Sequence, residues 1–485
     1  MKSHDSILND IMDRIITKKV GIVSLGCAKN LVNSEQMMYL IKSAGFEVTG
    51  ETNGADAVVV NTCAFIDSAK SEAIDTILEI SAARGKSGHG KIIVAGCLAQ
   101  RYKDEIMREL PEIDAVVGVG SYDRIVEAID GALTGGRPEF FGETGGPVSE
   151  TERVITTSKV WAYLKIAEGC DNRCAYCVIP DIRGRYRSRP IENIVKEAEW
   201  LAERGTKELI IVAQDVTRFG LDLYGKTRLA DLLSALCRID GIKWIRLHYL
   251  YPDEISDELI DVIAKNGKIL KYLDIPVQHI SDSILKKMNR RGNGEDIRTL
   301  FRRLRERIPG VVLRTSIIAG LPGEGDTEFQ ELCGFLREAK IERAGVFTYS
   351  PQEGTVAALM ERPEAGVAER RAELLAEIQT RIMDDFNGSR VGSVTAVLIE
   401  GYENTAQANA NTRPHSDQNQ RMREGPDSTG KRRYYGRSFA ESPDIDGYIT
   451  VTGSRAKPGE FVDVRITGVE YGGLTGVVCR RPYNI

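Results

Sequence analysis

Six of the nine cysteines fall into two sets of three whose spacing suits metal-cluster chemistry. One set, Cys170, Cys174 and Cys177, lies within eight residues in the pattern CxxxCxxC. Three thiolates on one short loop can bind three corners of a cubane iron–sulfur cluster and leave the fourth iron open for another ligand. The structural alternative is a zinc site in a loop, which would need a fourth ligand that this segment lacks.

The second set is spread along the chain but follows one rule. Cys27, Cys63 and Cys97 each come directly after a short apolar run, in VSLGC, VVNTC and VAGC. Successive strands joined by crossover helices point the same way, so the three thiols are expected at one edge of a parallel sheet. A helix start follows each one and favours negative charge there. A buried packing role is the alternative for each cysteine. Three cysteines at matching strand ends favour an iron–sulfur cluster with one open iron, because no fourth ligand for zinc occurs at matching spacing.

Alternating apolar runs and helical segments must position both sets. Residues 18–134 predict a parallel α/β domain, and a Gly- and Pro-rich stretch at 131–152 predicts a linker or an edge hairpin. Six further β/α units at 153–386 predict a partial (β/α)6 barrel, whose chemistry would sit at the carboxyl ends of its strands.

The last hundred residues have a different pattern. Short alternating strands without a long helix at 388–485 predict a small antiparallel β-barrel. Residues 403–433 contain no Leu, Ile, Val or aromatic side chain, which predicts a flexible insert. The fold class expected is therefore an α/β multidomain chain with a small C-terminal β-barrel.

Charge and composition exclude several classes. Seventy acidic and 65 basic residues in a chain of 485 leave a net charge of −5, so bulk charge cannot hold the chain to nucleic acid. No apolar run reaches the length of a membrane span, and Asp5, Asp10 and Asp13 do not fit a signal peptide. We expect a cytoplasmic, reducing compartment and no membrane association, with thiols acting as ligands rather than in disulfides.

The CxxxCxxC segment, with Tyr176 before its last cysteine, resembles the radical S-adenosylmethionine (SAM) superfamily. That resemblance implies a [4Fe-4S] cluster whose open iron is chelated by SAM, and one-electron cleavage of SAM to methionine and a deoxyadenosyl radical. Residues 318–324, IAGLPGE, resemble the adenine-contacting turn of the same superfamily. The resemblance makes seven residues candidates for SAM contact, five from these two segments and two at other strand ends: Tyr176, Gly320, Pro322, Gly323, Glu324, Gln214 and Gln278. His248 and His279 also end strands, where a structural role is the alternative.

Four arginines alternate after the cysteine loop, at positions 183, 185, 187 and 189. In an extended segment, a period of two would place all four on one side. Such a face is either a solvated charged surface or a basic lip for an acidic substrate or RNA phosphates. On the second interpretation, Arg183 and Arg185 contact the substrate.

Two trithiolate sites followed by a small β-barrel resemble the methylthiotransferase family, with an N-terminal cluster domain, a radical SAM core and a TRAM domain. Three segments look like those of the family members that modify an aspartate of a small-subunit ribosomal protein: SLGCAKNLVNSE (24–35), LDIPVQHISDSILKKMNRRG (273–292) and GRSFAESPDIDG (436–447). The tRNA-modifying members tend to show GCQMN-like and PVQSGS-like words instead.

That resemblance implies two [4Fe-4S] clusters and SAM as both methyl donor and radical source. The cluster on Cys170, Cys174 and Cys177 would generate the radical that takes hydrogen from the aspartate β-carbon. The auxiliary cluster on Cys27, Cys63 and Cys97 would supply the methylthio group. The expected partners are the ribosomal protein, an electron donor such as flavodoxin or ferredoxin, a sulfur source, and a contact with ribosomal RNA.

Two other functions are kept as alternatives. A tRNA adenosine C2 methylthiotransferase would share every cluster cysteine, and aromatic side chains of the last domain could stack on bases. A non-catalytic iron–sulfur electron carrier or RNA-binding regulator is the other, although the paired CxxxCxxC and GLPGE segments argue against it.

Overall fold

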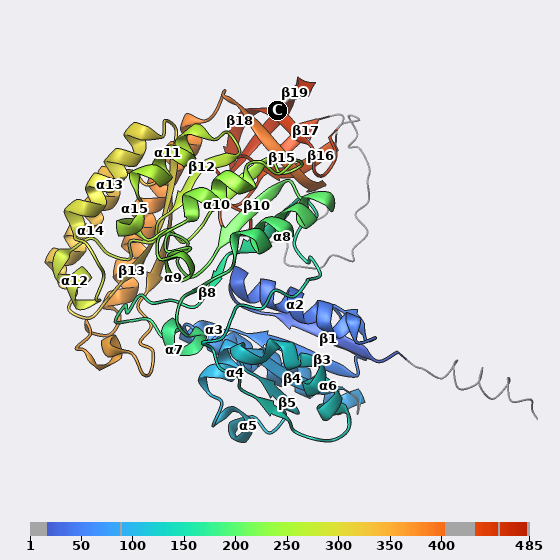
Figure 1. The fold of residues 1–485 in the computed structure, drawn as a ribbon. Helices are drawn as coiled ribbons and strands as arrows, with labels where there is room; N and C mark the ends of the chain where they lie inside the picture. Colours follow the sequence, from blue (N-terminus) through green and yellow to red (C-terminus); the bar gives the residue numbers. More distant parts are fainter. Residues whose placement is uncertain (1–16, 88–89, 403–431, 454–455, 483–485) are drawn as a thin grey trace, which may run out of the picture.

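The computed structural model describes residues 17–87, 90–402, 432–453 and 456–482 (Figure 1). The first sixteen residues, and residues 403–431 of the predicted insert, lie outside the described part. No helix within the described ranges is both long enough and apolar enough to cross a membrane.

The N-terminal region forms a six-stranded parallel sheet in the order β2-β1-β3-β4-β5-β6. The run AVVVNT of β3 is buried at every position, as expected for a strand covered on both faces. The strands are β1 (Lys19–Ser24), β2 (Glu47–Thr49), β3 (Ala57–Thr62), β4 (Lys91–Gly96), β5 (Ala115–Val117) and β6 (Glu139–Phe140). The helices are α2 (Ala28–Ser43), α3 (Asp67–Ser87), α4 (Cys97–Arg101), α5 (Ile106–Glu109), η1 (Val119–Arg124) and α6 (Ile125–Leu133). Because β6 comes from the predicted linker, this sheet extends beyond residue 134.

The central region is an open six-stranded parallel sheet in the order β14-β13-β12-β11-β10-β7. Its strands are β7 (Trp161–Lys165), β10 (Glu208–Val212), β11 (Trp244–Leu247), β12 (Ile269–Asp274), β13 (Val312–Ala319) and β14 (Arg343–Thr348). The longer helices are α8 (Ile191–Glu203), α10 (Leu229–Leu236), α11 (Asp257–Lys265), α13 (Gly294–Arg307), α14 (Asp326–Ala339) and α15 (Val367–Ser389). Short elements complete it: β8 (Ala167–Glu168), β9 (Arg187–Ser188), α7 (Ile179–Arg183), α9 (Leu221–Tyr224), η2 (Pro252–Glu254), α12 (Asp282–Lys287) and η3 (Val356–Leu359).

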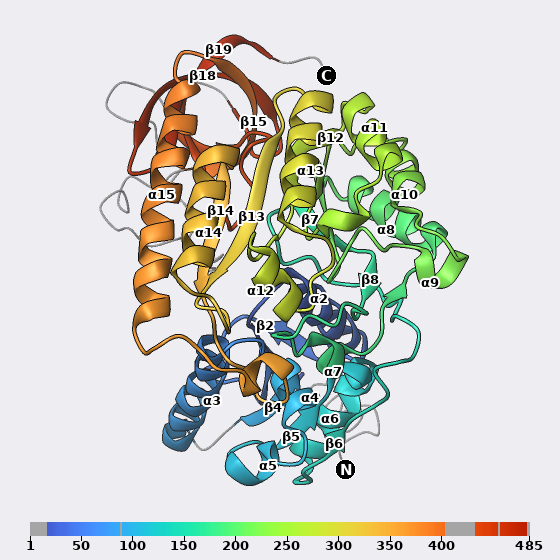
Figure 2. The same cartoon turned by 90° about the vertical axis from the view of Figure 1, so that its left-hand side faces the viewer.

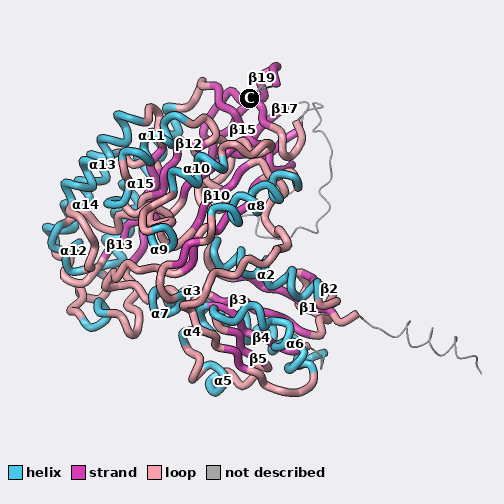
Figure 3. The backbone as a smooth tube through the Cα atoms, viewed as in Figure 1, coloured by secondary structure: helices cyan, strands magenta, loops and turns pink. Residues whose placement is uncertain are grey.

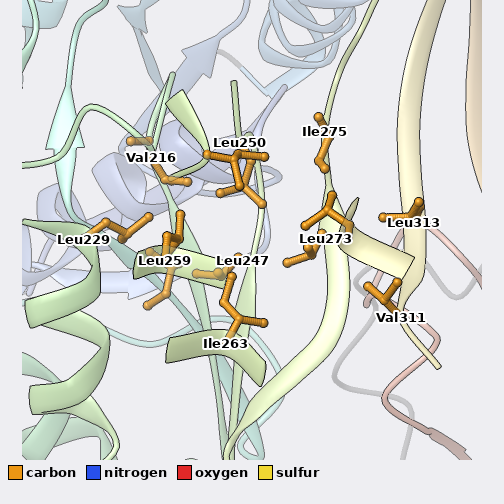
Figure 4. Close-up of a cluster of buried hydrophobic side chains, with 14 of the residues drawn as sticks. Val216, Leu229, Leu247, Leu250, Leu259, Ile263, Leu273, Ile275, Val311 and Leu313 are labelled. Carbon is orange, nitrogen blue, oxygen red and sulfur yellow. The ribbon is translucent and has the colours of Figure 1, made fainter. Parts of the chain in front are cut away.

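These helices cover the outer face of the central sheet (Figures 1 and 3). Apolar side chains of the strands, such as Leu247 and Leu273, pack against residues of the helices, such as Leu229 and Ile263 (Figure 4). Figure 2 shows α15 beside α14, where it packs along the edge strand β14. The six predicted β/α units of the partial barrel are therefore present.

The C-terminal strands form a closed barrel in the order β15-β16-β17-β19-β18. They are β15 (Val394–Tyr402), β16 (Arg432–Arg437), β17 (Ile449–Gly453), β18 (Phe461–Glu470) and β19 (Gly473–Pro482). One detail differs from the prediction, because β17 and β19 pair in parallel while the other pairs are antiparallel. Strand β18 follows β17 in the sequence but pairs with β15. The next strand, β19, runs back antiparallel to β18 and closes the barrel beside β17, in the same direction as β17.

The central sheet lies between the other two regions (Figure 1). Its amino ends meet the barrel: Trp161, which begins β7, donates to Glu400 Oε2 at 3.0 Å, and the ring of Trp244 packs edge-on against Phe461. Its carboxyl ends meet the N-terminal domain, where Lys165 Nζ donates to Asn33 Oδ1 of α2 at 3.1 Å. The ends that carry chemistry in parallel α/β folds therefore face the domain that carries the second cysteine set.

Candidate active site

Cys27, Cys63 and Cys97 lie at the carboxyl ends of the neighbouring strands β1, β3 and β4. Cys27 is the N-cap residue of α2 and Cys97 is the first residue of α4. Gly26 has φ of +89°, and a Cβ there would lie 2.7 Å from the Cβ of Cys63. Only glycine allows the β1–α2 turn to pass this close to Cys63, so the turn brings Cys27 and Cys63 together.

Two cations balance the charge of these thiols. Burial opposes ionisation of Cys27, but the charges of Lys29 and Arg183 and the backbone N–H groups of Asn30 and Lys29 outweigh it and lower its pKa. Arg183 Nη2 donates to Cys97 Sγ at 3.3 Å. Burial and the charges of the other two thiols raise the pKa of Cys63 to about 11, so all three cannot ionise freely without a bound cation.

A tyrosine that the sequence interpretation missed lies near two of these thiols, Cys97 and Cys27. Tyr122 is buried, its O–H has no hydrogen-bond partner in the described residues, and burial raises its pKa, with Arg183, Cys97 and Cys27 as its charged neighbours. Tyr122 follows β5, the next strand of the sheet after β4, so the rule that located the cysteines could have found it. Three thiols, a cation and an unpaired phenol fit an iron–sulfur cluster with hydrogen-bonded sulfurs.

The CxxxCxxC loop follows β8 and is held by backbone hydrogen bonds. Cys170 N donates to the carbonyl of Gly184 at 3.1 Å, and Ala175 N donates to the carbonyl of Met288 at 2.9 Å. Gly169 has φ of +77°, and a Cβ there would lie 2.0 Å from the carbonyl oxygen of Arg185. The loop is thereby fixed between the segment after α7 and the end of α12.

Burial raises the pKa of Cys170 to about 11 and raises that of Cys177, with thiolate repulsion contributing in both cases. Arg290 offsets this charge: its Nη1 lies 3.8 Å from Cys174 Sγ and donates to Tyr176 OH at 3.4 Å. Its guanidinium also stacks on the ring of Tyr251. Arg290 had no predicted role, although it lies in the segment LDIPVQHISDSILKKMNRRG (273–292). Three thiols beside one cation fit a cluster at this loop as well.

A buried network joins the two cysteine sets. Glu168 accepts from Arg183 Nη1 at 2.6 Å, from Lys165 Nζ at 3.0 Å and from Gln214 Nε2 at 3.0 Å. Arg183 reaches Asn30 Oδ1 and Cys97 in the N-terminal domain from the helix that follows the CxxxCxxC loop. One arginine therefore spans the boundary between the two sets.

The predicted arginine lip is wrong in its geometry. Only part of the segment is extended, because Arg183 belongs to α7 and the strand β9 covers Arg187–Ser188 alone, and Arg183 is 1% exposed. Arg189 is also buried and pairs with Glu150 and Glu197, while Arg185 is exposed. The four side chains therefore do not share one face, and Arg183 contacts Cys97 rather than the solvent.

The GLPGE turn follows β13 and depends on its glycines. Gly320 has φ of +78° and a Cβ would lie 2.2 Å from that of Ala368, while Gly323 has φ of +80° and packs against Lys287. The Glu324 carboxylate accepts from Gly320 N at 3.1 Å and from Arg371 Nη1 at 2.9 Å. Glu324 thus holds the turn in shape through Gly320 N and Arg371.

The remaining strand-end residues divide by their partners. Gln214 keeps its Oε1 buried without a partner in the described residues, and Gln278 has φ of +67° and bridges to Ile317. His279 accepts from Ser281 N at its Nδ1, which places its proton on Nε2, 3.3 Å from Glu324 Oε2. His248 packs with Ser442 of the C-terminal region. The buried amide oxygen of Gln214 is free to accept a hydrogen bond from a ligand, whereas both histidines have structural partners.

No three His, Cys, Asp or Glu side chains in the described ranges converge on a point that could hold a single metal ion. A cluster binds each thiolate through a different iron, so it does not require such convergence. The two cysteine sets therefore stay predictions of cluster sites rather than of single-ion sites.

Comparison with known families gives three matches along the chain. Residues 19–118 match the uncharacterized protein family UPF0004, residues 164–336 the radical SAM superfamily, and residues 424–479 the TRAM domain. Fold and site together define a radical SAM enzyme with an N-terminal cysteine-bearing domain and a TRAM barrel.

The chain is 46% identical over 471 residues to the ribosomal protein uS12 methylthiotransferase RimO of Acetivibrio thermocellus, covering 95% of this chain and 98% of that one. It is 48% identical to the RimO of Lachnoclostridium phytofermentans, covering 94% of this chain and 99% of that one. The chain belongs to the RimO family of ribosomal protein uS12 methylthiotransferases. Among solved structures, the radical SAM methyltransferase TsrM of Kitasatospora setae shares the fold, with a TM-score of 0.51, 16% identity, and coverage of 69% of this chain and 77% of that one.

Proposed function

We propose that this enzyme methylthiolates the β-carbon of an aspartate in ribosomal protein uS12, using two [4Fe-4S] clusters. The observation that carries the proposal is the junction of the two cysteine sets through Arg183 and Glu168, in a chain of the RimO family. A methylthio group must be delivered to the carbon that has lost hydrogen, so the two sites have to lie beside each other. The contact of Arg183, in the helix that follows the CxxxCxxC loop, with Cys97 supports that arrangement.

In this proposal Cys170, Cys174 and Cys177 hold the cluster that binds SAM, and Cys27, Cys63 and Cys97 hold the auxiliary cluster. When bound, these groups supply one-electron cleavage of SAM and a transferable sulfur. Arg290 balances the charge of the first set, and Arg183 and Lys29 balance that of the second. Tyr176, Gln214, Gln278 and the backbone of residues 320–323 orient SAM at the carboxyl ends of the strands.

Several partners belong to the same proposal. Reductive cleavage needs an external one-electron donor, for which flavodoxin or ferredoxin is suited, and repeated turnover needs a sulfur source. In this proposal the TRAM barrel, which lies at the amino ends of the central strands, contacts the ribosomal protein or ribosomal RNA. A ribosomal substrate is met in the cytoplasm.

The alternative substrate, an adenosine of tRNA, is not favoured, because the similar relatives are uS12 enzymes. An anaerobic assay with reconstituted enzyme, dithionite and SAM tests both substrates together. A peptide from the uS12 target loop should gain the mass of a methylthio group, and tRNA should not. Modification of tRNA with an unchanged peptide would overturn the proposal.

Cysteine variants test the division of labour between the sites. Replacing Cys170, Cys174 and Cys177 with Ala should leave one cluster and abolish formation of 5′-deoxyadenosine. Replacing Cys27, Cys63 and Cys97 should retain 5′-deoxyadenosine formation but stop methylthiolation. Cys237→Ala, outside both sets, is the control and should retain both reactions. Methylthiolation by the second variant would contradict the role given to the auxiliary site.

A further inference from the structure

Lys29 is the exception among the buried cations of the described chain. Nine Lys and Arg side chains there are less than 9% exposed, and eight of them pair with a carboxylate. Lys29, at 8% exposed, has no carboxylate partner among the described residues. A buried charge is costly unless it is paired, so an unpaired one needs another explanation.

The local structure makes the position of Lys29 still less favourable. It lies in the first turn of α2, where the helix dipole disfavours a cation, and that turn contains no acidic residue. Arg183, a second cation, is among the groups that oppose its charge. Neither helix capping nor internal ion pairing accounts for a lysine here.

The Lys29 ammonium lies between the auxiliary thiols and the central sheet. Its Nζ lies 3.5 Å from the ring centroid of Tyr249, which follows β11. Cys27 is two residues away, and its thiol and Lys29 act on each other's ionisation. Neighbouring residues of α2, including Ala28 and Val32, pack with Tyr163 of β7 on the inner side of the sheet. A group at Lys29 is therefore next to the auxiliary site and at the mouth of the partial barrel.

The Lys29 ammonium lies over the ring of Tyr249, and its N–H donors meet no carboxylate in the described part of the chain. A carboxylate brought beside this ammonium would complete the missing ion pair, with the aromatic ring of Tyr249 next to it.

We propose that Lys29 binds the side-chain carboxylate of the substrate aspartate. This inference rests on the proposed function. The carboxyl carbon of aspartate is bonded directly to the β-carbon, at about 1.5 Å. Holding the carboxylate in place therefore also positions the reacting carbon. Holding it two residues from Cys27 places that carbon beside the auxiliary site. Adenine has no carboxylate, so the same residue selects aspartate over a nucleobase.

The test measures binding as well as turnover. Fluorescence anisotropy under anaerobic conditions gives the Kd of a labelled uS12 peptide, and of the same peptide with Asn at the target position, for the reconstituted enzyme. The wild type should prefer the Asp peptide. Lys29→Met should weaken binding of the Asp peptide by about 30-fold or more and change binding of the Asn peptide little. Lys29→Arg should recover part of the preference.

Two controls separate binding from folding. Lys42→Met removes one charge from the exposed end of the same helix and should leave both Kd values unchanged. Lys29→Met leaves no carboxylate unpaired, so its Tm should equal or exceed that of the wild type. A lowered Tm with an unchanged preference for Asp would show a structural lysine and overturn the inference.

The outcomes also separate this inference from the proposed function. If the wild type modifies the uS12 peptide but Lys29→Met keeps the same Asp-to-Asn ratio of Kd, whatever its iron content, only the assignment of Lys29 is wrong. If the wild type neither binds nor modifies the peptide, the proposed function fails and the inference fails with it.

Discussion

At the scale of single residues, buried charges near the cysteines are balanced pair by pair. Glu168 is buried, yet Arg183 and Lys165 outweigh the burial and hold its pKa well below the ordinary value. Its carboxylate therefore stays ionised and orients Arg183 toward Cys97. The same logic singles out Lys29, which lies over the ring of Tyr249 but has no carboxylate partner among the described residues.

His248 provides a pH-dependent test of a buried residue. Burial, with help from the charges of Arg314 and Arg246, lowers its pKa to about 3, although Asp274 opposes this. Its Nε2 lies 2.9 Å from Ser442 Oγ. Below about pH 6.5 the unfolded chain takes up a proton on this imidazole and the folded chain does not, so stability falls as the pH falls from 6.5 toward 3.

We expect the unfolding free energy of the iron-free protein to drop by about 1.4 kcal/mol more in the wild type than in His248→Gln between pH 7.5 and pH 5.5. Urea unfolding followed by circular dichroism at the two pH values measures the difference. Equal drops in both proteins would mean that His248 is already protonated in the fold or is exposed to water.

At the scale of elements, the turn after β13 is fixed by conformation rather than by side-chain chemistry. Gly320→Ala would require φ near +78° with a Cβ 2.2 Å from that of Ala368 in α15. Strain and overpacking together should cost about 3 kcal/mol of unfolding free energy. Gly310→Ala is the matched control: φ is +74° but nothing lies within 4 Å, so about 1 kcal/mol is expected. Equal losses in the two variants, measured by urea unfolding, would mean that contact with α15 is unimportant.

The same scale shows how far the sequence could predict this fold. The apolar runs before Cys63 and Cys97 are the ends of β3 and β4, because buried parallel strands produce continuous hydrophobic runs. Strand ends then placed the cysteines at one edge. The prediction that the four alternating arginines share one face was wrong, because Arg183 lies in helix α7 and the chain becomes extended only after it. Residues that alternate in the sequence lie on one face only if the whole segment is a strand, so the secondary structure must be assigned correctly first.

Contacts between distant segments could not be predicted in this way. Arg183 meets Asn30, 153 residues away in the sequence, and no local pattern indicates that pairing. Lys29 and Arg290 matter because of what surrounds them in three dimensions. The parallel closure of β17 on β19 likewise follows from the path of the whole barrel rather than from either strand.

At the scale of the whole molecule, a buried ion network fastens the TRAM barrel to the central sheet. Arg437 of β16 is fully buried and its Nη2 donates to Glu208 Oε2, at the start of β10, at 2.7 Å. It also pairs with Glu400 of the barrel, while Glu208 pairs with Arg246. The barrel therefore docks at the amino ends of the strands, opposite the CxxxCxxC loop.

Arg437→Met should loosen this docking without disturbing the cysteine loop. It leaves Glu400 and half of the Glu208 carboxylate buried without a cation, at a cost of about 3–5 kcal/mol. Arg465→Met, on an exposed position of β18, should cost less than about 0.5 kcal/mol.

Limited proteolysis should release the C-terminal region faster from Arg437→Met than from the wild type or the control. Because the reaction site lies at the other end of the sheet, 5′-deoxyadenosine formation without ribosomal substrate should persist, while modification of uS12 should fall. Unchanged proteolysis would mean that apolar packing, such as Trp244 against Phe461, holds the barrel without the ion network.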